Sequence, residues 1–288
     1  MRIFVTGATG FLGRHVIPTL LQRGHAVIAT AVESQEVAMR SPWLSQCSYV
    51  QYDLSHRDSS VFLRMGKPDT LLHLAWQGLP HYTELYHIEQ NLWSNYYFIK
   101  DMVCGGLRDL TVTGTCFEYG MREGCLDESM EPQPANAYAV AKDSLRRFLD
   151  MLQVHMPFQL RWVRLFYMYG PGQSPNALLA QLQAALDRGD SVFNMSGGEQ
   201  VRDYLPVEVM AERIVACAVQ QQVRGPINCC SGSPVTVRAL VEQYLAARHT
   251  RIELNLGYYP YPAYEPMAFW GATTRLETVL ANEGGPAR

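Results

Sequence analysis

Three glycines, at positions 7, 10 and 13, follow a short apolar stretch near the start of the chain. Residues 3–5 have the composition of a buried strand, and residues 11–22 have the apolar spacing of an amphipathic helix. Glycine permits a tight turn and a close approach of a ligand to the backbone, while a helix N-terminus attracts negative charge. This order of elements predicts that the pyrophosphate of a dinucleotide binds at the turn between Thr6 and Gly13.

The glycine spacing matches a variant of the commonest dinucleotide fingerprint, because the first step is three residues rather than two. An ordinary strand-to-helix turn is the alternative interpretation. The turn residues that we expect to contact the cofactor are Gly7, Thr9, Gly10, Phe11, Leu12 and Gly13.

The sequence leaves the choice between NAD(H) and NADP(H) open. An acidic residue at the end of the second strand would bind the adenosine ribose, but Ala31 stands there and Glu33 comes two residues late. A missing carboxylate removes repulsion against a 2′-phosphate and favours NADP(H), yet the nearest arginine, Arg40, is too far along the chain to assign. Asp53 and Leu54, after the third strand, are candidates for contact with adenine, with a polar strand end as the alternative.

Apolar runs suited to buried strands alternate with longer helical patterns. The expected strands cover residues 3–5, 26–31, 49–52, 70–74, 110–113 and 160–165, and the helical segments between them include residues 11–22, 84–103 and 138–153. This alternation predicts an α/β fold, a Rossmann-type doubly wound parallel sheet.

The amino-acid composition of the chain changes after about Gly170, where proline, glycine and polar residues become frequent. We expect a smaller C-terminal substrate-binding unit there, interleaved with the sheet. The predicted division assigns residues 1–166 plus 204–230 to the dinucleotide-binding domain and residues 167–203 plus 231–288 to the smaller domain.

Composition limits the partners. Lys and Arg number 24 against 27 Asp and Glu, a net charge of −3, which argues against nucleic acid. The seven cysteines lack the CxxC pairs or Cys/His clusters of metal sites, so we expect reduced thiols and no metal. The chain shows neither a charged leader nor an apolar run long enough to span a bilayer. These features predict a cytoplasmic protein without a membrane partner.

Tyr138 and Lys142 stand four residues apart and therefore share one face of a predicted helix. An ammonium near a phenol favours the phenolate and lowers its pKa from about 10, so the tyrosine becomes a usable proton donor or acceptor near neutrality. Such pairs arise often by chance on solvated helices. This one gains meaning because it follows the glycine turn and the segment TGTCFEYG at residues 113–120.

With these motifs in this order, the chain resembles the extended short-chain dehydrogenase/reductase family along nearly its whole length. Further motifs that carry the resemblance are His73-Leu74-Ala75, Asn91, residues 169–172 and residues 202–204. The resemblance implies that Leu74, Ala75, Asn91 and Thr113 contact the cofactor.

The resemblance also implies the chemical roles. Tyr138 would be the catalytic acid/base, Lys142 would in addition bind the nicotinamide ribose, and Thr115 would hydrogen-bond the reacting oxygen, with Thr113 as the alternative. Hydride would move between the nicotinamide and a sugar carbon while Tyr138 gives or takes the hydroxyl proton.

Extended members of the family mostly act on nucleotide sugars, and Arg202 stands where they bind the substrate diphosphate. A guanidinium suits this task because it forms paired, charge-assisted bonds to phosphate oxygens; a surface ion pair is the alternative. Asn176 is a weaker candidate for the same pocket. Cys116 and Tyr167 complete the expected substrate-binding set, although many epimerases have an asparagine in place of Tyr167.

Departures from the family pattern narrow the reaction. Family dehydratases carry an Asp-Glu pair after the catalytic Ser/Thr, where this chain has Cys116 and Phe117. Dehydration is therefore disfavoured, as is the epimerase-reductase chemistry that needs a cysteine in place of Phe117. Two reactions remain: reduction of a 4-keto-6-deoxyhexose, or 4-epimerisation with retained NAD. The short C-terminal unit and residues 265–271 resemble the 4-ketoreductase branch and favour the reductase.

Two further expectations come from the resemblance. A non-catalytic, cofactor-sensing or RNA-associated relative is the outside alternative, but such relatives commonly lose the Tyr/Lys pair and this chain offers little positive charge to phosphate backbones. Many relatives form homodimers through two helices per subunit, and the aromatic residues 92–99 are a candidate for that face, with core packing as the alternative.

Overall fold

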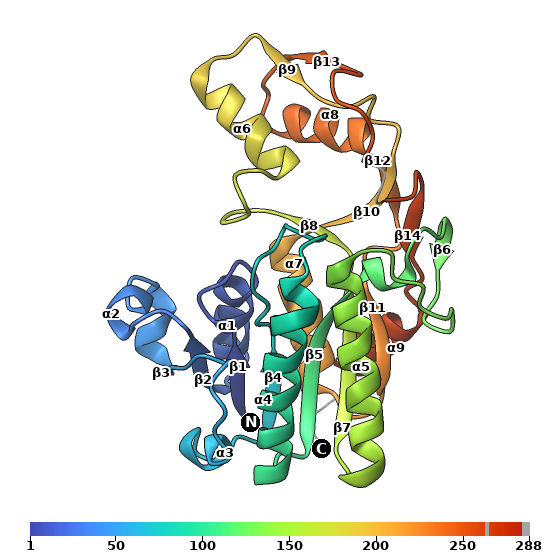
Figure 1. The fold of residues 1–288 in the computed structure, drawn as a ribbon. Helices are drawn as coiled ribbons and strands as arrows, with labels where there is room; N and C mark the ends of the chain where they lie inside the picture. Colours follow the sequence, from blue (N-terminus) through green and yellow to red (C-terminus); the bar gives the residue numbers. More distant parts are fainter. Residues whose placement is uncertain (263–264, 284–288) are drawn as a thin grey trace.

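The computed structural model describes residues 1–262 and 265–283. Seven parallel strands form the central sheet, in the order β11-β7-β5-β4-β1-β2-β3 (Figure 1). They are β1 (Arg2–Thr6), β2 (Ala26–Ala31), β3 (Ser48–Gln51), β4 (Thr70–His73), β5 (Asp109–Thr115), β7 (Gln159–Leu165) and β11 (Gly225–Cys229). The predicted doubly wound sheet is confirmed. Its order reverses between β1 and β4, where such sheets bind ligands at the carboxyl ends of the strands.

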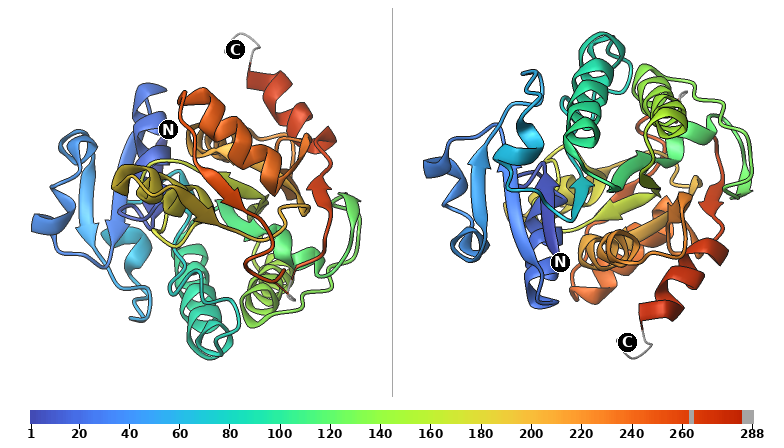
Figure 2. Two further views of the ribbon diagram at one scale, coloured as in Figure 1. Left: turned by 90° about the horizontal axis from the view of Figure 1, so that it is seen from above. Right: turned by 90° about the horizontal axis from the view of Figure 1, so that it is seen from below.

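Helices cover both faces of this sheet, as the view from below shows (Figure 2). On one face lie α1 (Gly13–Gln22), α7 (Val207–Val219) and α9 (Thr274–Glu283), whose apolar residues share a core cluster with Ile3 and Val5 of β1. On the other face lie α3 (Val61–Arg64), α4 (Leu92–Gly105) and α5 (Ala137–His155), which pack around Phe4 and Leu71. Strands buried on both faces are rich in apolar residues. β1 and β2 follow this pattern, whereas β5 and β7 also bury the polar side chains of Thr111, Arg161 and Arg164.

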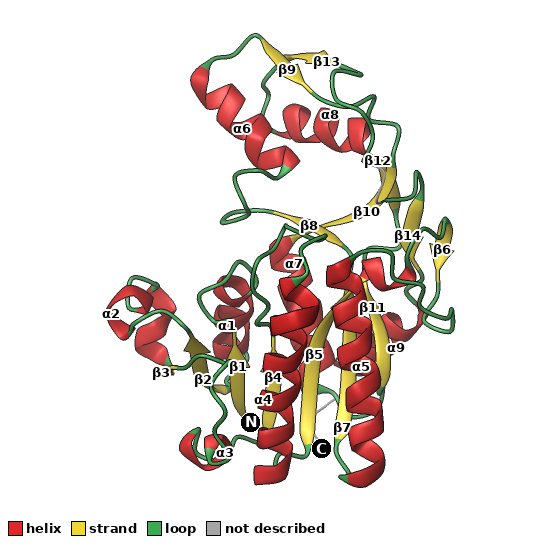
Figure 3. Ribbon diagram, viewed as in Figure 1, coloured by secondary structure: helices red, strands yellow, loops and turns green. Residues whose placement is uncertain are grey.

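The chain after β7, joined by the short strand β6 (Gly124–Leu126) from the segment between β5 and α5, builds a second region above the carboxyl edge of the sheet (Figures 1 and 3). Its strands are β8 (Tyr167–Tyr169), β10 (Val201–Pro206) and β12 (Pro234–Thr236) in one small sheet, β9 (Val192–Asn194) with β13 (Glu253–Asn255), and β14 (Phe269–Gly271) with β6. Two helices, α6 (Leu178–Arg188) and α8 (Val237–Ala247), share their own apolar cluster with β9. This separate core provides the smaller unit that the composition after Gly170 indicates.

The end of the described chain returns to the large sheet. Leu276 and Val279 of α9 are buried in the cluster that also holds α1 and α7. The sequence-based division assigned residues 231–288 to the smaller domain, whereas α9 packs against the large sheet. Its two buried apolar residues, three positions apart, lie on one face of the helix, and this face contacts the core of the sheet.

The remaining elements are short. The helix α2 (Gln35–Ala38) follows β2, 3-10 turns cover Pro42–Gln46 and Cys116–Tyr119, and a π-helical turn, His87–Asn91, precedes α4. Of the helices in the described residues, none has the length and apolar character needed to cross a membrane.

Candidate functional site

The glycine turn lies at the carboxyl end of β1, directly before α1. Gly7 has φ +71°, and a Cβ built there would lie 2.9 Å from the backbone nitrogen of Ala75. A Cβ on Gly13 would collide with the carbonyl oxygens of Gly7 and Ala8. The turn therefore needs glycine for its backbone conformation and for close packing against the segment after β4.

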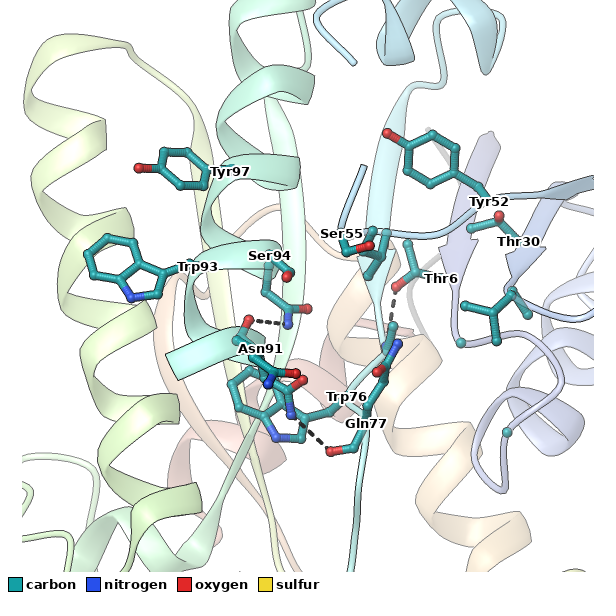
Figure 4. Close-up of a pocket in the computed structure, with 18 of the residues that line it drawn as sticks. Thr6, Thr30, Tyr52, Ser55, Trp76, Gln77, Asn91, Trp93, Ser94 and Tyr97 are labelled. Atoms are coloured by element: carbon teal, nitrogen blue, oxygen red, sulfur yellow. Dashed lines mark hydrogen bonds between the residues drawn. The ribbon is translucent and has the colours of Figure 1, made fainter. Parts of the chain in front are cut away.

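Two cavities meet at this turn, one of about 570 Å³ and one of about 500 Å³. Gly7, Gly10, Ala75 and Trp76 line both, so the cavities form one groove across the carboxyl edge of the sheet. Figure 4 shows the larger cavity, with Asn91, Trp93 and Tyr97 on the α4 side and Thr6, Thr30 and Tyr52 on the strand side. An extended ligand that crosses the glycine turn fits this shape.

The larger cavity holds part of the predicted cofactor set. Thr9, Leu54 and Asn91 line it. The amide of Asn91 donates to the carbonyl oxygen of Gln77 over 2.9 Å, and so connects the π-helical turn to the segment after β4 (Figure 4). Asp53 is outside the set of lining residues, and its carboxylate accepts a hydrogen bond from the backbone of Ser55 instead.

Glu33 also lines the larger cavity, and sequence analysis dismissed it as two residues late. Its Oε2 accepts a hydrogen bond from the Thr9 hydroxyl over 2.8 Å. The turn after β2 therefore brings a carboxylate to the glycine turn, although no acidic residue occupies the end of the strand. This carboxylate repels a 2′-phosphate and favours NAD(H) over NADP(H).

The smaller cavity is lined by further residues that were predicted to bind the cofactor or to take part in the reaction, whereas Gly13 of the turn lines neither cavity. Its described lining includes Phe11, Leu12, Leu74, Thr113, Thr115, Cys116, Tyr138, Lys142 and Tyr167. Tyr138 and Lys142 come from α5, and Thr115 comes from the end of β5. The helix α5 begins here because the Asn136 side chain caps it, accepting from the amide of Ala139 over 2.9 Å.

Tyr138, Thr115 and Lys142 are all buried. The pKa of the Tyr138 phenol is raised above its usual range, whereas the sequence predicted that Lys142 would lower it. Burial is the main cause, and a hydrogen bond with the Thr115 side chain acts in the opposite direction. The Lys142 ammonium donates to the carbonyl oxygen of Thr113 over 2.8 Å. Burial lowers the pKa of Lys142 to about 7, so its charge state changes near neutrality.

Glu118 holds the loop that carries Thr115. Its carboxylate accepts the backbone N–H of Thr115 over 2.9 Å and bonds from the Trp162 indole and the Arg164 guanidinium, at 2.9 Å and 2.7 Å. The side chain of Thr115 in turn accepts from the amide of Phe117, which completes a capping box. Glu118 and Arg164 form an ion pair with side-chain exposures of 0% and 1%.

Two predicted substrate residues, Arg202 and Asn176, are not among the residues that line the smaller cavity, although Arg202 lies 5.8 Å from the ring centroid of Tyr167, which does line it. Arg202 of β10 is buried, and its guanidinium donates to Glu265 Oε2 over 2.8 Å and to the carbonyl oxygen of Met267 over 3.1 Å. It also lies 4.6 Å from the ring centroid of Phe269. Asn176 is exposed in the loop before α6.

Sequence reasoning missed Trp76 and Glu118. Both act through residues distant in the sequence, so neither spacing nor periodicity could indicate them. A weak signal existed for Glu118, because a Thr followed three positions later by Glu is the pattern of a capping box. Within the described residues, no group of three or more His, Cys, Asp or Glu side chains is arranged to bind a metal ion.

Comparison with known proteins gives consistent matches. A family model described as "NAD dependent epimerase/dehydratase family" matches residues 3–230. The dTDP-6-deoxy-L-talose 4-dehydrogenase (NAD(+)) of Aggregatibacter actinomycetemcomitans is 31% identical over 94% of this chain and 100% of its own length. The UDP-glucose 4-epimerase of Mycolicibacterium smegmatis is 25% identical over 98% and 92% of the two chains.

Among solved structures, a UDP-glucuronic acid 4-epimerase from Bacillus cereus, in complex with UDP-glucuronic acid and NAD, superposes with a TM-score of 0.83 at 21% identity. The superposition covers 100% of this chain and 95% of the epimerase chain. The two chains therefore share their fold from end to end.

Proposed function

The chain belongs to the NAD-dependent epimerase/dehydratase family, and from that premise we propose that it reduces a nucleotide-activated 4-keto-6-deoxyhexose. The observation that carries the proposal is the buried group of Thr115, Tyr138 and Lys142, located where the groove passes from the glycine turn to the smaller cavity. The family membership confirms the resemblance noted in the sequence and makes NAD the cofactor.

The residues present fit NAD. A glycine turn without room for a Cβ lies beside a groove with two connected cavities, and Glu33 faces the larger one. When bound, the reduced cofactor supplies a hydride to the carbonyl carbon of the sugar. Tyr138 gives its phenolic proton to the carbonyl oxygen, and Thr115 hydrogen-bonds the same oxygen. Lys142 binds the ribose and stabilises the phenolate that remains on Tyr138.

The lining of the smaller cavity supports a sugar without charge. Lys142 is the single charged residue among its described lining residues, whereas Tyr82, Phe117 and Tyr167 contribute aromatic surface. A carboxylate at C6 of the sugar would find no second cation there, whereas a methyl group suits an apolar wall. A 6-deoxyhexose is therefore favoured over a uronic acid, in agreement with the sugar in the name of the 31%-identical relative.

A 4-epimerase that retains NAD is the second candidate. Several relatives with 22–25% identity are UDP-glucose 4-epimerases, and epimerisation needs the same hydride and proton equipment. The two reactions differ in one observable, because a reductase consumes the reduced cofactor and an epimerase does not.

The deciding experiment incubates the purified protein with dTDP- and GDP-4-keto-6-deoxyhexoses and NADH, and follows the absorbance at 340 nm. We expect one NADH consumed for each sugar reduced. A parallel incubation with a nucleotide hexose that carries a 4-hydroxyl group, and with NAD, tests the second candidate. Formation of its 4-epimer with no net change in cofactor, together with no oxidation of NADH by the keto sugars, would replace the reductase by the epimerase.

The role of Tyr138 is tested by Tyr138→Phe, which removes one hydroxyl from the buried ring. We expect the turnover number to fall roughly 10²–10⁴-fold, the usual contribution of a general acid, while the dissociation constant for NADH stays within a factor of about two. Full turnover of this variant would contradict the catalytic assignment.

We also propose a cytoplasmic homodimer. All seven cysteines are free thiols, which suits a reducing compartment. On α4 and α5, Trp93, Met151 and Val154 are exposed although they are large and apolar, and Trp93 packs against Phe148 of the neighbouring helix. Light scattering should give twice the monomer mass, and the double variant Met151→Glu/Val154→Glu should give a monomer.

A further inference from the structure

Trp76 lies at the point where the two cavities of the groove meet, and its side chain lines both. It follows β4 directly after the Leu74 and Ala75 positions expected to contact the cofactor. The indole makes an edge-to-face contact with the Tyr138 ring, with centroids 5.8 Å apart. Trp76 therefore touches the predicted acid/base without itself carrying a group that can exchange a proton near neutrality.

A chain of hydrogen bonds, which starts at the indole nitrogen, fixes the position of the Trp76 ring. Its Nε1–H donates to Nδ1 of His87 over 3.0 Å, and the planes of the two rings are 22° apart. The other ring nitrogen of His87 bonds the carbonyl oxygen of His81 over 2.9 Å. Asn91 also lies within 3.2 Å of His87 Nδ1. Because His87 is fully buried in a π-helical turn, its ring has little freedom, and neither has the indole.

A face of the indole is in contact with Lys142. The ammonium nitrogen lies 4.1 Å from the indole centroid, well inside the range of a cation–π interaction, for which tryptophan is the best partner. One of the three ammonium donors binds the Thr113 carbonyl oxygen. The indole and that carbonyl together fix where the remaining donors point.

We propose that Trp76, fixed by its hydrogen bond to His87, is a positioning residue that seats the Lys142 ammonium and keeps it charged beside Tyr138. The attraction between the indole face and a cation is lost when the lysine loses its proton. Trp76 thereby supports the ammonium in a buried site.

The other titratable groups around Lys142 show why such support matters. Burial disfavours the ammonium, whereas the Glu118 carboxylate, in the 3-10 turn after β5, favours it. Burial lowers the pKa values of His73 of β4 and of His87 of the π-helical turn, and the positive charge of Lys142 acts in the same direction. Tyr138, on the same helix, has a raised pKa. Lys142 is thus faced by neutral rings and by one carboxylate that Arg164 already pairs.

The chain contains three lysines, Lys67, Lys100 and Lys142, which makes a direct measurement possible. Lysine labelled with ¹³C at Cε should give three resonances, and Lys67→Arg and Lys100→Arg assign two of them. The pH titration of the third reports the proton affinity of Lys142. It needs neither cofactor nor substrate, so its outcome does not depend on the proposed reaction.

The test compares Trp76→Leu and Trp76→Phe with the unaltered chain. We expect Trp76→Leu, which keeps an apolar side chain without a π face, to lower the Lys142 pKa by about one unit, a tenfold loss of proton affinity. Trp76→Phe keeps a weaker face and should give a shift in the same direction of about half that size.

Trp93→Leu is the matched control, because Trp93 lines the same cavity but its ring packs on Tyr97 and Phe148. It should leave the Lys142 titration unchanged. The proposal is overturned if Trp76→Leu has a native circular dichroism spectrum and Lys142 titrates as in the unaltered chain. If Trp76→Leu does not fold, Trp76→Phe decides: a lower pKa supports the proposal and an unchanged one overturns it.

Discussion

The hydroxyl of Thr9 donates a hydrogen bond to the Glu33 carboxylate over 2.8 Å. This contact joins the glycine turn after β1 to the loop after β2, and both residues line the larger cavity. A negative charge in this place acts on whatever the adenosine end of the cofactor carries, since charges a few ångströms apart interact strongly in a partly buried site. The relationship therefore bears on which cofactor the protein accepts.

We predict that the protein binds NADH more tightly than NADPH by at least about tenfold, and that Glu33→Ser reduces this preference about tenfold. The serine keeps a polar group near Thr9 and removes the charge that repels a 2′-phosphate. Dissociation constants follow from the fluorescence of the bound nicotinamide. Glu36→Ser, an exposed site on α2, is the control and should change neither constant.

Glu33 also shows what the sequence could and could not predict. The strands, the doubly wound order and the pairing of Tyr138 with Lys142 depend on local periodicity, which can be read directly. The position of the ribose carboxylate depends on the path of the loop after β2. Because no acidic residue occupies the end of the second strand, where one is usually found, the sequence favoured NADP(H). In the folded protein the loop after β2 brings Glu33 to the larger cavity.

Trp76 and Glu118 were not predicted for a related reason. Trp76 gains its role from His87 and Lys142, which come from different elements, and Glu118 gains its role from Trp162 and Arg164 of β7. Contacts of this kind between distant segments leave no periodic signal in a single sequence. Local rules thus predict the candidate reacting residues, whereas the residues that hold them in place are determined by tertiary contacts.

The stability of the protein should fall in acid because of His73. This side chain is fully buried, with Nδ1 2.9 Å from the Thr6 hydroxyl and Nε2 2.6 Å from the Asn95 side-chain oxygen. Burial lowers its pKa to about 3, so the folded protein keeps it neutral. The unfolded chain takes up a proton below its ordinary pKa of about 6.5. The contribution of neutral His73 to the free energy of unfolding is therefore fully present above pH 6.5. It is lost as the pH falls toward 3, by about 1.4 kcal/mol per pH unit.

Urea unfolding at several pH values measures this loss. We expect His73→Gln to be less stable than the unaltered chain at pH 7 and to lose less further stability between pH 6 and pH 4. His56→Gln, whose side chain is exposed, should keep the original slope. An identical slope in His73→Gln would show that other groups cause the acid sensitivity.

Glu118→Gln should destabilise the protein strongly. The carboxylate is fully buried, pairs with Arg164 and accepts the Thr115 amide. Removal of its charge leaves the guanidinium buried without a counter-charge, which typically costs about 3–5 kcal/mol. Glu242→Gln breaks the exposed pair with Arg238 and should cost less than about 1 kcal/mol. Equal urea midpoints for the two variants would contradict this role of Glu118.

The ion pair of Arg202 with Glu265 predicts how a nucleotide diphosphate binds. Arg202 already directs its guanidinium at Glu265 Oε2 and at the Met267 carbonyl oxygen, and the pair is nearly fully buried, with side-chain exposures of 3% and 11%. A diphosphate that uses Arg202 must therefore displace this carboxylate.

Glu265→Gln removes the competing charge and should tighten the binding of dTDP by about tenfold. Arg202→Gln should weaken the binding by tenfold or more, because it removes about the free energy of one charge-assisted hydrogen bond. Calorimetric titration with dTDP measures both, and Arg238→Gln, on the surface of α8, should leave the affinity unchanged. If Arg202→Gln binds dTDP as the unaltered chain does, the guanidinium serves the packing of β10 against the segment from Glu265 to Met267 and takes no part in substrate recognition.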